Sequence, residues 1–185
     1  MSSPTEGEAA AGRRRERLFF ALWPDPELRR RLAELGRRYA PAEARRVAPA
    51  DLHLTLAFVG GCDAARRACL ERVAAGVRAA PLRFCLDRIG YWARPRVLWL
   101  GAARQPAALR ALAERLQQAL GACDHPPDER PFRAHVTLAR KVRQPLAARL
   151  EPPLCWHAER FCLVRSRTTP AGVHYQVVRD WPLRP

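Results

Sequence analysis

Apolar and polar positions follow one another along the chain in short blocks, and these blocks predict strands and helices. The run RLFFALW at residues 17–23 has the length of a buried strand and stops at Pro24. The next segment, residues 25–40, spaces its leucines three and four positions apart, and its opening Asp-Pro pair is suited to a helix N-terminus. These blocks therefore predict a strand followed by an amphipathic helix.

The same order of elements continues and then begins again in the second half. The predicted elements are, in order, a strand at 53–61, a helix at 63–80, strands at 82–92 and 96–102, a helix at 105–121, a Pro-rich loop at 123–134, a strand from residue 135, and strands at 157–168 and 173–183. The repetition predicts an α+β fold of two pseudo-symmetric lobes around a central cleft. Each lobe is expected to be a sheet rich in antiparallel strands with helices on its outer face.

The length of 185 residues fits one domain that buries a proper core. Residues 1–16 are small, polar and charged, and we expect a disordered tail there, with the folded domain at 17–185. The chain has no apolar segment near the length that spans a bilayer, and because residues 1–16 lack an apolar stretch we expect no secretory signal there. These features predict a cytoplasmic protein without a membrane partner.

The charge is strongly basic, with 33 Lys and Arg against 18 Asp and Glu, giving +15. Such a field attracts polyanions, of which nucleic acid is the commonest. A GC-rich genome would explain the choice of Arg over Lys but not the excess of positive charge. An anionic partner is therefore expected, and an Arg-rich rim is a candidate surface for an RNA backbone; its candidate residues are Arg94, Arg96, Arg130 and Arg133.

The six cysteines include no pair at the spacing of zinc ligands. Several lie inside apolar runs that read as strands. Without an export signal, they are expected to be small buried side chains with free thiols in a reducing compartment, and no metal site is expected. These residues are Cys62, Cys69, Cys85, Cys123, Cys155 and Cys162.

Two similar fragments, HLTLAF and HVTLAR, begin at His53 and His135 and repeat the pattern His-x-Thr-Leu. Side chains alternate between the two faces of a strand. His53 and Thr55 are therefore expected on one face and the leucines on the core face, and His135 and Thr137 divide in the same way. If the lobes face each other, two imidazoles and two hydroxyls converge on one cleft.

Paired histidines suit phosphoryl chemistry near neutral pH, because a neutral ring can take a proton from water while a protonated ring gives one to the leaving oxygen. Threonine hydroxyls can donate to phosphate oxygens. Two other interpretations stay open from the residues alone. Each histidine can be structural, or the pair can bind a metal, although neither motif carries a carboxylate at ligand spacing.

Taken in order, the segments RLFFALWP, DLHLTLAFVG, RVLWLG and RPFRAHVTLAR make the chain resemble the RNA 2′,3′-cyclic phosphodiesterases, formerly named 2′-5′ RNA ligases (LigT type), of the 2H phosphoesterase superfamily. The resemblance runs from about Arg17 to Pro185. It implies the LigT-like bilobal fold and cofactor-free, metal-independent hydrolysis of terminal 2′,3′-cyclic phosphates on RNA to 2′-phosphomonoesters.

The resemblance also implies roles for five residues. His53 would donate the proton to the leaving 3′ oxygen, and His135 would activate water. Thr55 and Thr137 would hold the phosphate, assisted by Arg140. Strict strand alternation, however, places Arg140 on the face opposite His135.

Other family features map less directly onto this sequence. The family suggests an aromatic wall for the terminal base near Phe19 or Phe20. Arg133 stands where relatives can have a histidine, which affects the RNA-facing rim rather than the acid–base pair. The remaining histidines are expected to be surface or structural residues; they are His125, His157 and His174.

The main hypothesis is thus a monomeric enzyme that acts on RNA ends or nucleotides bearing a 2′,3′-cyclic phosphate, with a possible reverse activity as a 2′-5′ RNA ligase. One alternative is a phosphodiesterase for small cyclic nucleotides or 2′-5′ oligonucleotides. Another is a non-catalytic RNA-binding module, although binding alone does not need two titratable groups.

Overall fold

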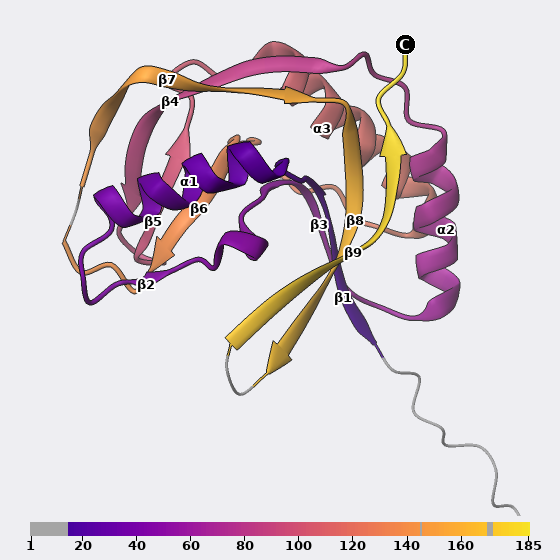
Figure 1. Ribbon diagram of the computed structural model, residues 1–185. Coiled ribbons are helices and arrows are strands. Elements are labelled where there is room, and N and C mark those ends of the chain that lie inside the picture. Colours follow the sequence, from indigo (N-terminus) through magenta and orange to yellow (C-terminus); the bar gives the residue numbers. More distant parts are fainter. Residues whose placement is uncertain (1–14, 145, 170–171) are drawn as a thin grey trace, which may run out of the picture.

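The computed structural model describes residues 15–144, 146–169 and 172–185 (Figure 1). The expected tail at 1–16 falls outside these residues except for its last two, and Glu16 already belongs to the first strand. The elements in chain order are β1 (Glu16–Leu22), α1 (Pro26–Tyr39), β2 (Arg45–Arg46), the 3₁₀ turn η1 (Pro49–Asp51), β3 (Leu54–Cys62), α2 (Ala64–Ala75), β4 (Leu82–Trp92), β5 (Val97–Gly101), α3 (Ala107–Leu120), the 3₁₀ turn η2 (Gly121–Cys123), β6 (His135–Arg140), β7 (Ala148–Ala158), β8 (Arg160–Thr169) and β9 (Gly172–Pro182).

The strands form one antiparallel sheet in the order β7-β4-β5-β6-β3-β1-β8-β9, with the short β2 added to β6. The predicted α+β class with antiparallel pairing is therefore confirmed. The two lobes are the two halves of this sheet, and they meet where β3 pairs with β6 through Leu54 and Val136. Both His-x-Thr motifs thus lie on neighbouring central strands.

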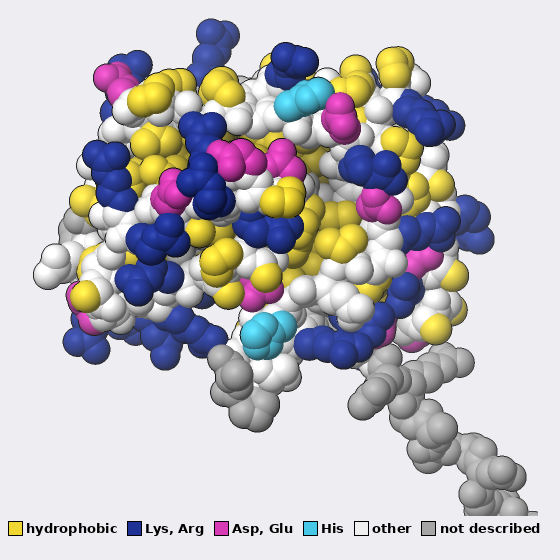
Figure 2. Space-filling view, viewed as in Figure 1, with side chains coloured by type: hydrophobic (Ala, Val, Ile, Leu, Met, Phe, Trp, Pro, Cys, Tyr) yellow, Lys and Arg dark blue, Asp and Glu magenta, His cyan; other side chains and the backbone are white. Residues whose placement is uncertain are grey.

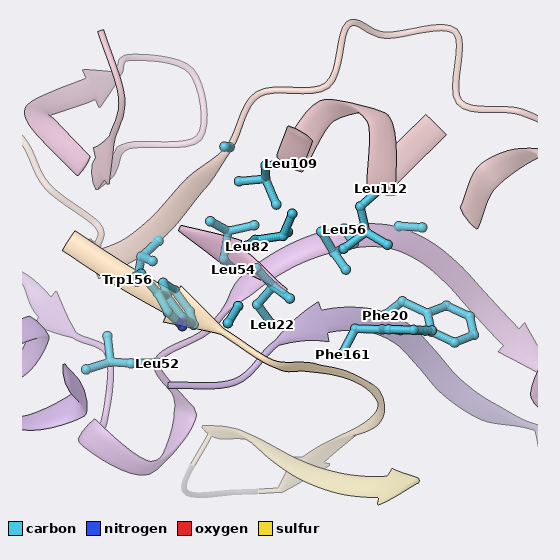
Figure 3. Packing of buried hydrophobic residues seen from close by; sticks show 14 of the residues in the cluster. Phe20, Leu22, Leu52, Leu54, Leu56, Leu82, Leu109, Leu112, Trp156 and Phe161 are labelled. Atoms are coloured by element: carbon cyan, nitrogen blue, oxygen red, sulfur yellow. The ribbon is translucent and has the colours of Figure 1, made fainter. Parts of the chain in front are cut away.

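The helices hold the two halves together. α1 follows a strand of the first half but contacts β6 of the second, whereas α3 follows a strand of the second half and contacts β3 of the first. Figure 3 shows Leu109 and Leu112 of α3 among the buried side chains of the strands, including Leu54 and Leu56. Burial of this shared apolar surface stabilises the junction between the halves.

The helix ends follow from local sequence. Asp25 caps α1 by accepting a hydrogen bond from the Leu28 amide at 2.8 Å, and Asp63 caps α2 by accepting one from the Arg66 amide at 2.9 Å. α2 ends at Ala75, earlier than the expected end at residue 80, and the amide of the cap residue Gly76 donates to the Val73 carbonyl at 3.1 Å, which tightens the last turn.

The strand β7 was not predicted. It includes Pro152 and Pro153, which lack the amide donors that a ladder needs, so its sequence does not read as a strand. In the sheet, β7 has one neighbour, β4, and lies at the edge. An edge position leaves one side of the strand unpaired, and prolines are tolerated there.

The expectation of free thiols is wrong for four of the six cysteines. Disulfides link Cys69 to Cys123 and Cys85 to Cys155, with Cα–Cα distances of 5.8 and 3.9 Å. The partners are 54 and 70 residues apart in sequence, and only the packing of α2 against η2 and of β4 against β7 brings them together. The remaining two, Cys62 and Cys162, are buried and free, as expected.

Basic side chains are spread over the face seen in Figure 2, with acidic groups fewer and more scattered. This distribution agrees with the net charge of +15. Among the described residues, no helix is long and apolar enough to cross a membrane.

Candidate active site

The two motif histidines are held in the same way in the two halves. Nδ1 of His53 lies 2.7 Å from the carbonyl oxygen of Asp51, and Nδ1 of His135 lies 2.8 Å from that of Arg133. A carbonyl only accepts, so Nδ1 donates in both rings. The neutral form of each ring therefore carries its proton on Nδ1 and leaves Nε2 free to accept.

The antiparallel pairing of β3 with β6 arranges the four motif side chains around one point. Because Leu54 lies opposite Val136, His53 falls beside Thr137 and Thr55 beside His135. The two histidines occupy one diagonal of this rectangle, a separation of roughly 7–8 Å in a regular sheet. All four side chains line a single cleft of about 1440 Å³. The predicted convergence of the motifs is found between adjacent strands rather than between facing walls.

Each motif strand contains a one-residue bulge at the same position, and β3 has a second bulge further on, at Val59. The pairing of β1 with β3 skips Leu56, and the pairing of β5 with β6 skips Leu138, which is the same position of the motif. A bulge reverses the alternation of side chains beyond it. Arg140 therefore lines the cleft, against the expectation from strict alternation, and so does Phe58, which is 59% exposed.

Aromatic rings surround His53 on three sides. Trp23 stacks on it with 5.5 Å between ring centroids and an interplanar angle of 4°. Tyr175 meets it edge-on at 4.9 Å, and Phe19 lies tilted at 4.8 Å. These contacts fix the plane of the ring and remove much of its surface from water.

The structure distinguishes between the two candidate aromatics of β1. Phe19 lines the cleft, whereas Phe20 is 0% exposed and belongs to the hydrophobic core. On the other half, Trp92 meets His135 edge-on with 4.5 Å between centroids. Each histidine thus has aromatic neighbours of its own, but from different elements.

The environment lowers the pKa of both rings. Burial lowers the pKa of His53 to about 4, opposed by the hydrogen bond to the Asp51 carbonyl and assisted by Arg140 and, when that ring is protonated, by His135. Burial also lowers the pKa of His135, again opposed by its carbonyl partner and assisted by Arg140. Both rings are therefore neutral in the free protein at pH 7.

Sequence reasoning did not single out four residues around this site. Trp23, Trp92 and Tyr175 read as ordinary apolar strand residues, and periodicity does not separate a cleft aromatic from a core one. Asp51 precedes the first histidine by two positions, and its carboxylate accepts a hydrogen bond from the Tyr175 amide at 3.1 Å. For Asp51, the only signal in the sequence was that the second motif has a basic residue, Arg133, at the matching position two residues before its histidine.

The arginines proposed for the rim divide into two groups. Arg133 and Arg130 line the cleft, although Arg130 is paired with Asp128 at 2.7 Å. Arg94 and Arg96 are not among the residues that line it. Within residues 15–144, 146–169 and 172–185, His, Cys, Asp and Glu form no group of three that could hold a metal ion.

The other histidines are placed differently from one another. His125 has Nδ1 3.3 Å from an Arg66 guanidinium nitrogen, and His157 is exposed on β7 near Glu159. His174, by contrast, lines the cleft with Nδ1 3.8 Å from a carboxylate oxygen of Asp51.

Comparison with known proteins agrees with this fold. Residues 24–170 match the model of the 2′-5′ RNA ligase superfamily. The chain is 34% identical over 174 residues to the RNA 2′,3′-cyclic phosphodiesterase of Escherichia coli K12, covering 91% of this chain and 97% of that protein. It is 36% identical to the phosphodiesterase of the same name from Thermus thermophilus, covering 91% of this chain and 90% of that one.

The solved structure of Escherichia coli LigT complexed with 3′-AMP superposes with a TM-score of 0.85 and 30% identity, covering 92% of this chain and 99% of that one. The fold and the paired histidine motifs define a 2H-type phosphoesterase. The chain belongs to the 2′-5′ RNA ligase superfamily and, within it, to the family of RNA 2′,3′-cyclic phosphodiesterases.

Proposed function

We propose that this enzyme hydrolyses the 2′,3′-cyclic phosphate at the 3′ end of RNA to a 2′-phosphomonoester and a free 3′ hydroxyl. The observation that carries the proposal is the shared geometry of His53 and His135. Each has Nδ1 committed to a carbonyl, which leaves Nε2 as its reactive nitrogen, and both line one cleft across the Leu54–Val136 pair. General acid and general base catalysis require two such nitrogens around one phosphorus atom.

In the proposed reaction, His135 acts as the base. Its lowered pKa keeps Nε2 unprotonated, so it can take a proton from a water molecule as the water oxygen attacks phosphorus. The bond from phosphorus to the 3′ oxygen breaks as the new bond forms. The departing 3′ oxygen takes a proton from Nε2 of His53, and proton exchange with solvent then resets both rings.

His53 must therefore be protonated when the substrate is bound, although it is neutral in the free protein. Burial is the main cause of its low pKa, and the positive charge of Arg140 contributes. A cyclic phosphate brings a negative charge into the same space and offsets the charge of Arg140, which raises the pKa of His53. The substrate thus helps to charge its own general acid.

Three further groups are placed to hold the phosphate. Thr55 and Thr137 lie on the same face as the histidines and line the cleft, and their hydroxyls can donate to non-bridging oxygens. Arg140 contributes a guanidinium that suits a phosphate in geometry and charge. Stabilisation of the developing charge by such donors is a large part of catalysis, and it asks for no metal or cofactor in this scheme.

The dimensions and charge of the cleft favour an RNA end over a free nucleotide. Its volume of about 1440 Å³ exceeds the roughly 300–1,000 Å³ typical of small-molecule sites, and Arg130 and Arg133 add positive charge to its lining. Contacts to further backbone phosphates would add affinity that a mononucleotide cannot gain. Hydrolysis of small cyclic nucleotides is the alternative substrate class.

The proposal is tested with an oligoribonucleotide that ends in a 2′,3′-cyclic phosphate, in the presence of EDTA. We expect turnover to continue and the product to be the 2′-phosphate, identified by phosphorus NMR. Loss of activity in EDTA would contradict the metal-independent mechanism. Binding without turnover would favour an RNA-binding module, and a higher kcat/KM for the matching mononucleoside cyclic phosphate would favour the small-nucleotide alternative.

A further inference from the structure

Asp51 is the one buried charged side chain among the residues that the structure describes, with 7% of its surface exposed. Burial of a carboxylate is unfavourable unless polar partners replace the water that it loses. Its position in η1, two residues before His53, places this unfavourable group beside the catalytic pair. A carboxylate buried at this position is therefore expected to have a specific structural or functional role.

The polar groups of Asp51 connect η1, the ring of His53 and β9. Its amide donates to the Ala48 carbonyl at 2.9 Å within η1, and its carbonyl accepts from Nδ1 of His53 at 2.7 Å. One carboxylate oxygen accepts from the Tyr175 amide of β9 at 3.1 Å, and the other lies 3.8 Å from Nδ1 of His174. A single residue thus joins the ring of His53 to β9.

This connection matters because β9 is an edge strand. Among the described residues it pairs only with β8, and no strand lies on its other side (Figure 1). The bond from the Tyr175 amide to Asp51 supplies an anchor on the side toward the cleft. The Tyr175 ring, held in this way, meets both His53 and Phe19 edge-on, at 4.9 and 5.2 Å between centroids.

The second half of the molecule provides an internal comparison. Arg133 occupies the position of Asp51, and its carbonyl holds His135 with nearly the same geometry. Its side chain, however, is exposed and belongs to the cleft rim. The link through a buried carboxylate is therefore confined to His53, although both histidines make the same main-chain bond.

We propose that Asp51 is a positioning residue for His53. Its carboxylate fixes β9 at Tyr175, so that the Asp51 carbonyl and the Tyr175 ring together hold the His53 imidazole in one orientation and one tautomer. The acceptor oxygen, rather than the negative charge, carries this role, because the hydrogen bond to an amide needs only an acceptor. The effect of Asp51 on kcat rests on the proposed function, whereas its effect on the orientation and tautomer of His53 does not.

The experiment compares the full-length enzyme with three variants, Asp51→Ala, Asp51→Ser and Asp51→Asn. Asparagine keeps an acceptor oxygen at the same reach, whereas serine is too short and alanine has none. We expect Asp51→Asn to retain kcat within a few fold. The other two should lose about 10- to 100-fold in kcat on a cyclic-phosphate substrate, with little change in KM, because misorientation affects the reacting group rather than binding.

Nitrogen-15 NMR of the imidazoles supplies a readout that is independent of turnover. In Asp51→Ala and Asp51→Ser, His53 should change from a single Nδ1–H tautomer to a mixture, while His135 keeps its own. Asp51→Asn should leave both rings unchanged. Equal changes in both histidines, an unchanged His53 in the serine and alanine variants, or an asparagine variant as impaired as alanine would each overturn the proposal. Absence of turnover in the unmodified enzyme would contradict the proposed function alone, since the NMR comparison would still decide the positioning role.

Discussion

Leu54 of β3 lies directly opposite Val136 of β6, and this backbone pair joins the two halves of the sheet. Both residues are fully buried, so their neighbours in each strand point to the cleft face. The pair is the centre of the pseudo-two-fold relation between the motifs. Because the strands are antiparallel, each histidine is brought beside the threonine of the other motif.

This arrangement predicts that the two histidines are individually required but chemically distinct. His53→Ala and His135→Ala should each lower kcat by about 10²- to 10⁴-fold on RNA ending in a 2′,3′-cyclic phosphate. The p-nitrophenolate leaving group of a p-nitrophenyl phosphodiester departs without a proton. On this substrate, His53→Ala should therefore retain much of the activity of the unmodified enzyme. His135→Ala should stay inactive, since water must still be activated.

His157→Ala, on the exposed part of β7, is the matched control and should behave as the unmodified enzyme. Rates of both motif variants that equal those of the control would refute the catalytic assignment. The reverse pattern on the p-nitrophenyl ester would exchange the roles of acid and base.

Arg140 is predicted to affect both the binding of phosphate and the protonation of the two motif histidines. Its charge is one of the causes that lower the pKa of His53 and of His135. Arg140→Ala should therefore raise the pKa of both rings, as measured by NMR titration, and weaken phosphate binding. Arg31→Ala, on the exposed face of α1, is the control and should change neither. Unaltered histidine titration in Arg140→Ala would show that the guanidinium does not act on the cleft.

The low pKa of His53 predicts how stability depends on pH. In the unfolded chain the ring titrates near its ordinary value of 6.5, whereas in the folded protein it titrates at about 4. Above pH 6.5 the ring is neutral in both states, so the stability that its burial contributes to the folded protein is fully present. As the pH falls from 6.5 to 4, only the unfolded chain takes up the proton, and the free energy of unfolding decreases by up to roughly 3 kcal/mol.

Urea unfolding at pH 7 and pH 4.5 measures this effect. His53→Gln should lose less stability than the unmodified protein over that interval, because glutamine does not titrate. His157→Gln should lose as much as the unmodified protein. The same loss in all three proteins would show that His53 is not the group responsible.

The two disulfides predict a protein that is stabilised by oxidation. They close loops of 54 and 70 residues. Each such crosslink restricts the unfolded chain and typically raises the free energy of unfolding by about 2–4 kcal/mol. Thiol titration of the denatured, unreduced protein should find two reactive cysteines, and a reducing agent should lower Tm. Six reactive thiols in the protein as purified would instead support the expectation from the sequence.

Gly90 is predicted to be required for packing. A Cβ at this position would lie 2.1 Å from Cζ2 of Trp99, whose ring also crosses Gly101. Gly90→Ala should therefore cost about 1–3 kcal/mol through overpacking, measured as a loss in Tm or in urea unfolding. Gly121→Ala is the control, because a Cβ there meets nothing within 4 Å. Equal stability of the two variants would mean that the Trp99 ring moves aside at little cost.

Much of the site follows from local pattern. The repeated His-x-Thr-Leu fragments predicted which four side chains share a face, because alternation depends only on the strand. Helix starts were also readable, since Asp25 and Asp63 make their capping bonds within their own segments. The edge strand β7 was not readable, because its prolines are compatible with a strand only when a free edge exists.

The sequence by itself determined the two histidines, the two threonines and the alternating pattern that places them on one face, because these depend on neighbours a few residues away. Only the tertiary structure decided that the motifs sit on adjacent strands of one sheet. It also placed bulges that turn Arg140 and Phe58 into the cleft, and it brought Asp51 to Tyr175 across 124 positions. Pairing register and long-range contact depend on how the whole chain packs, and no local pattern contains that information.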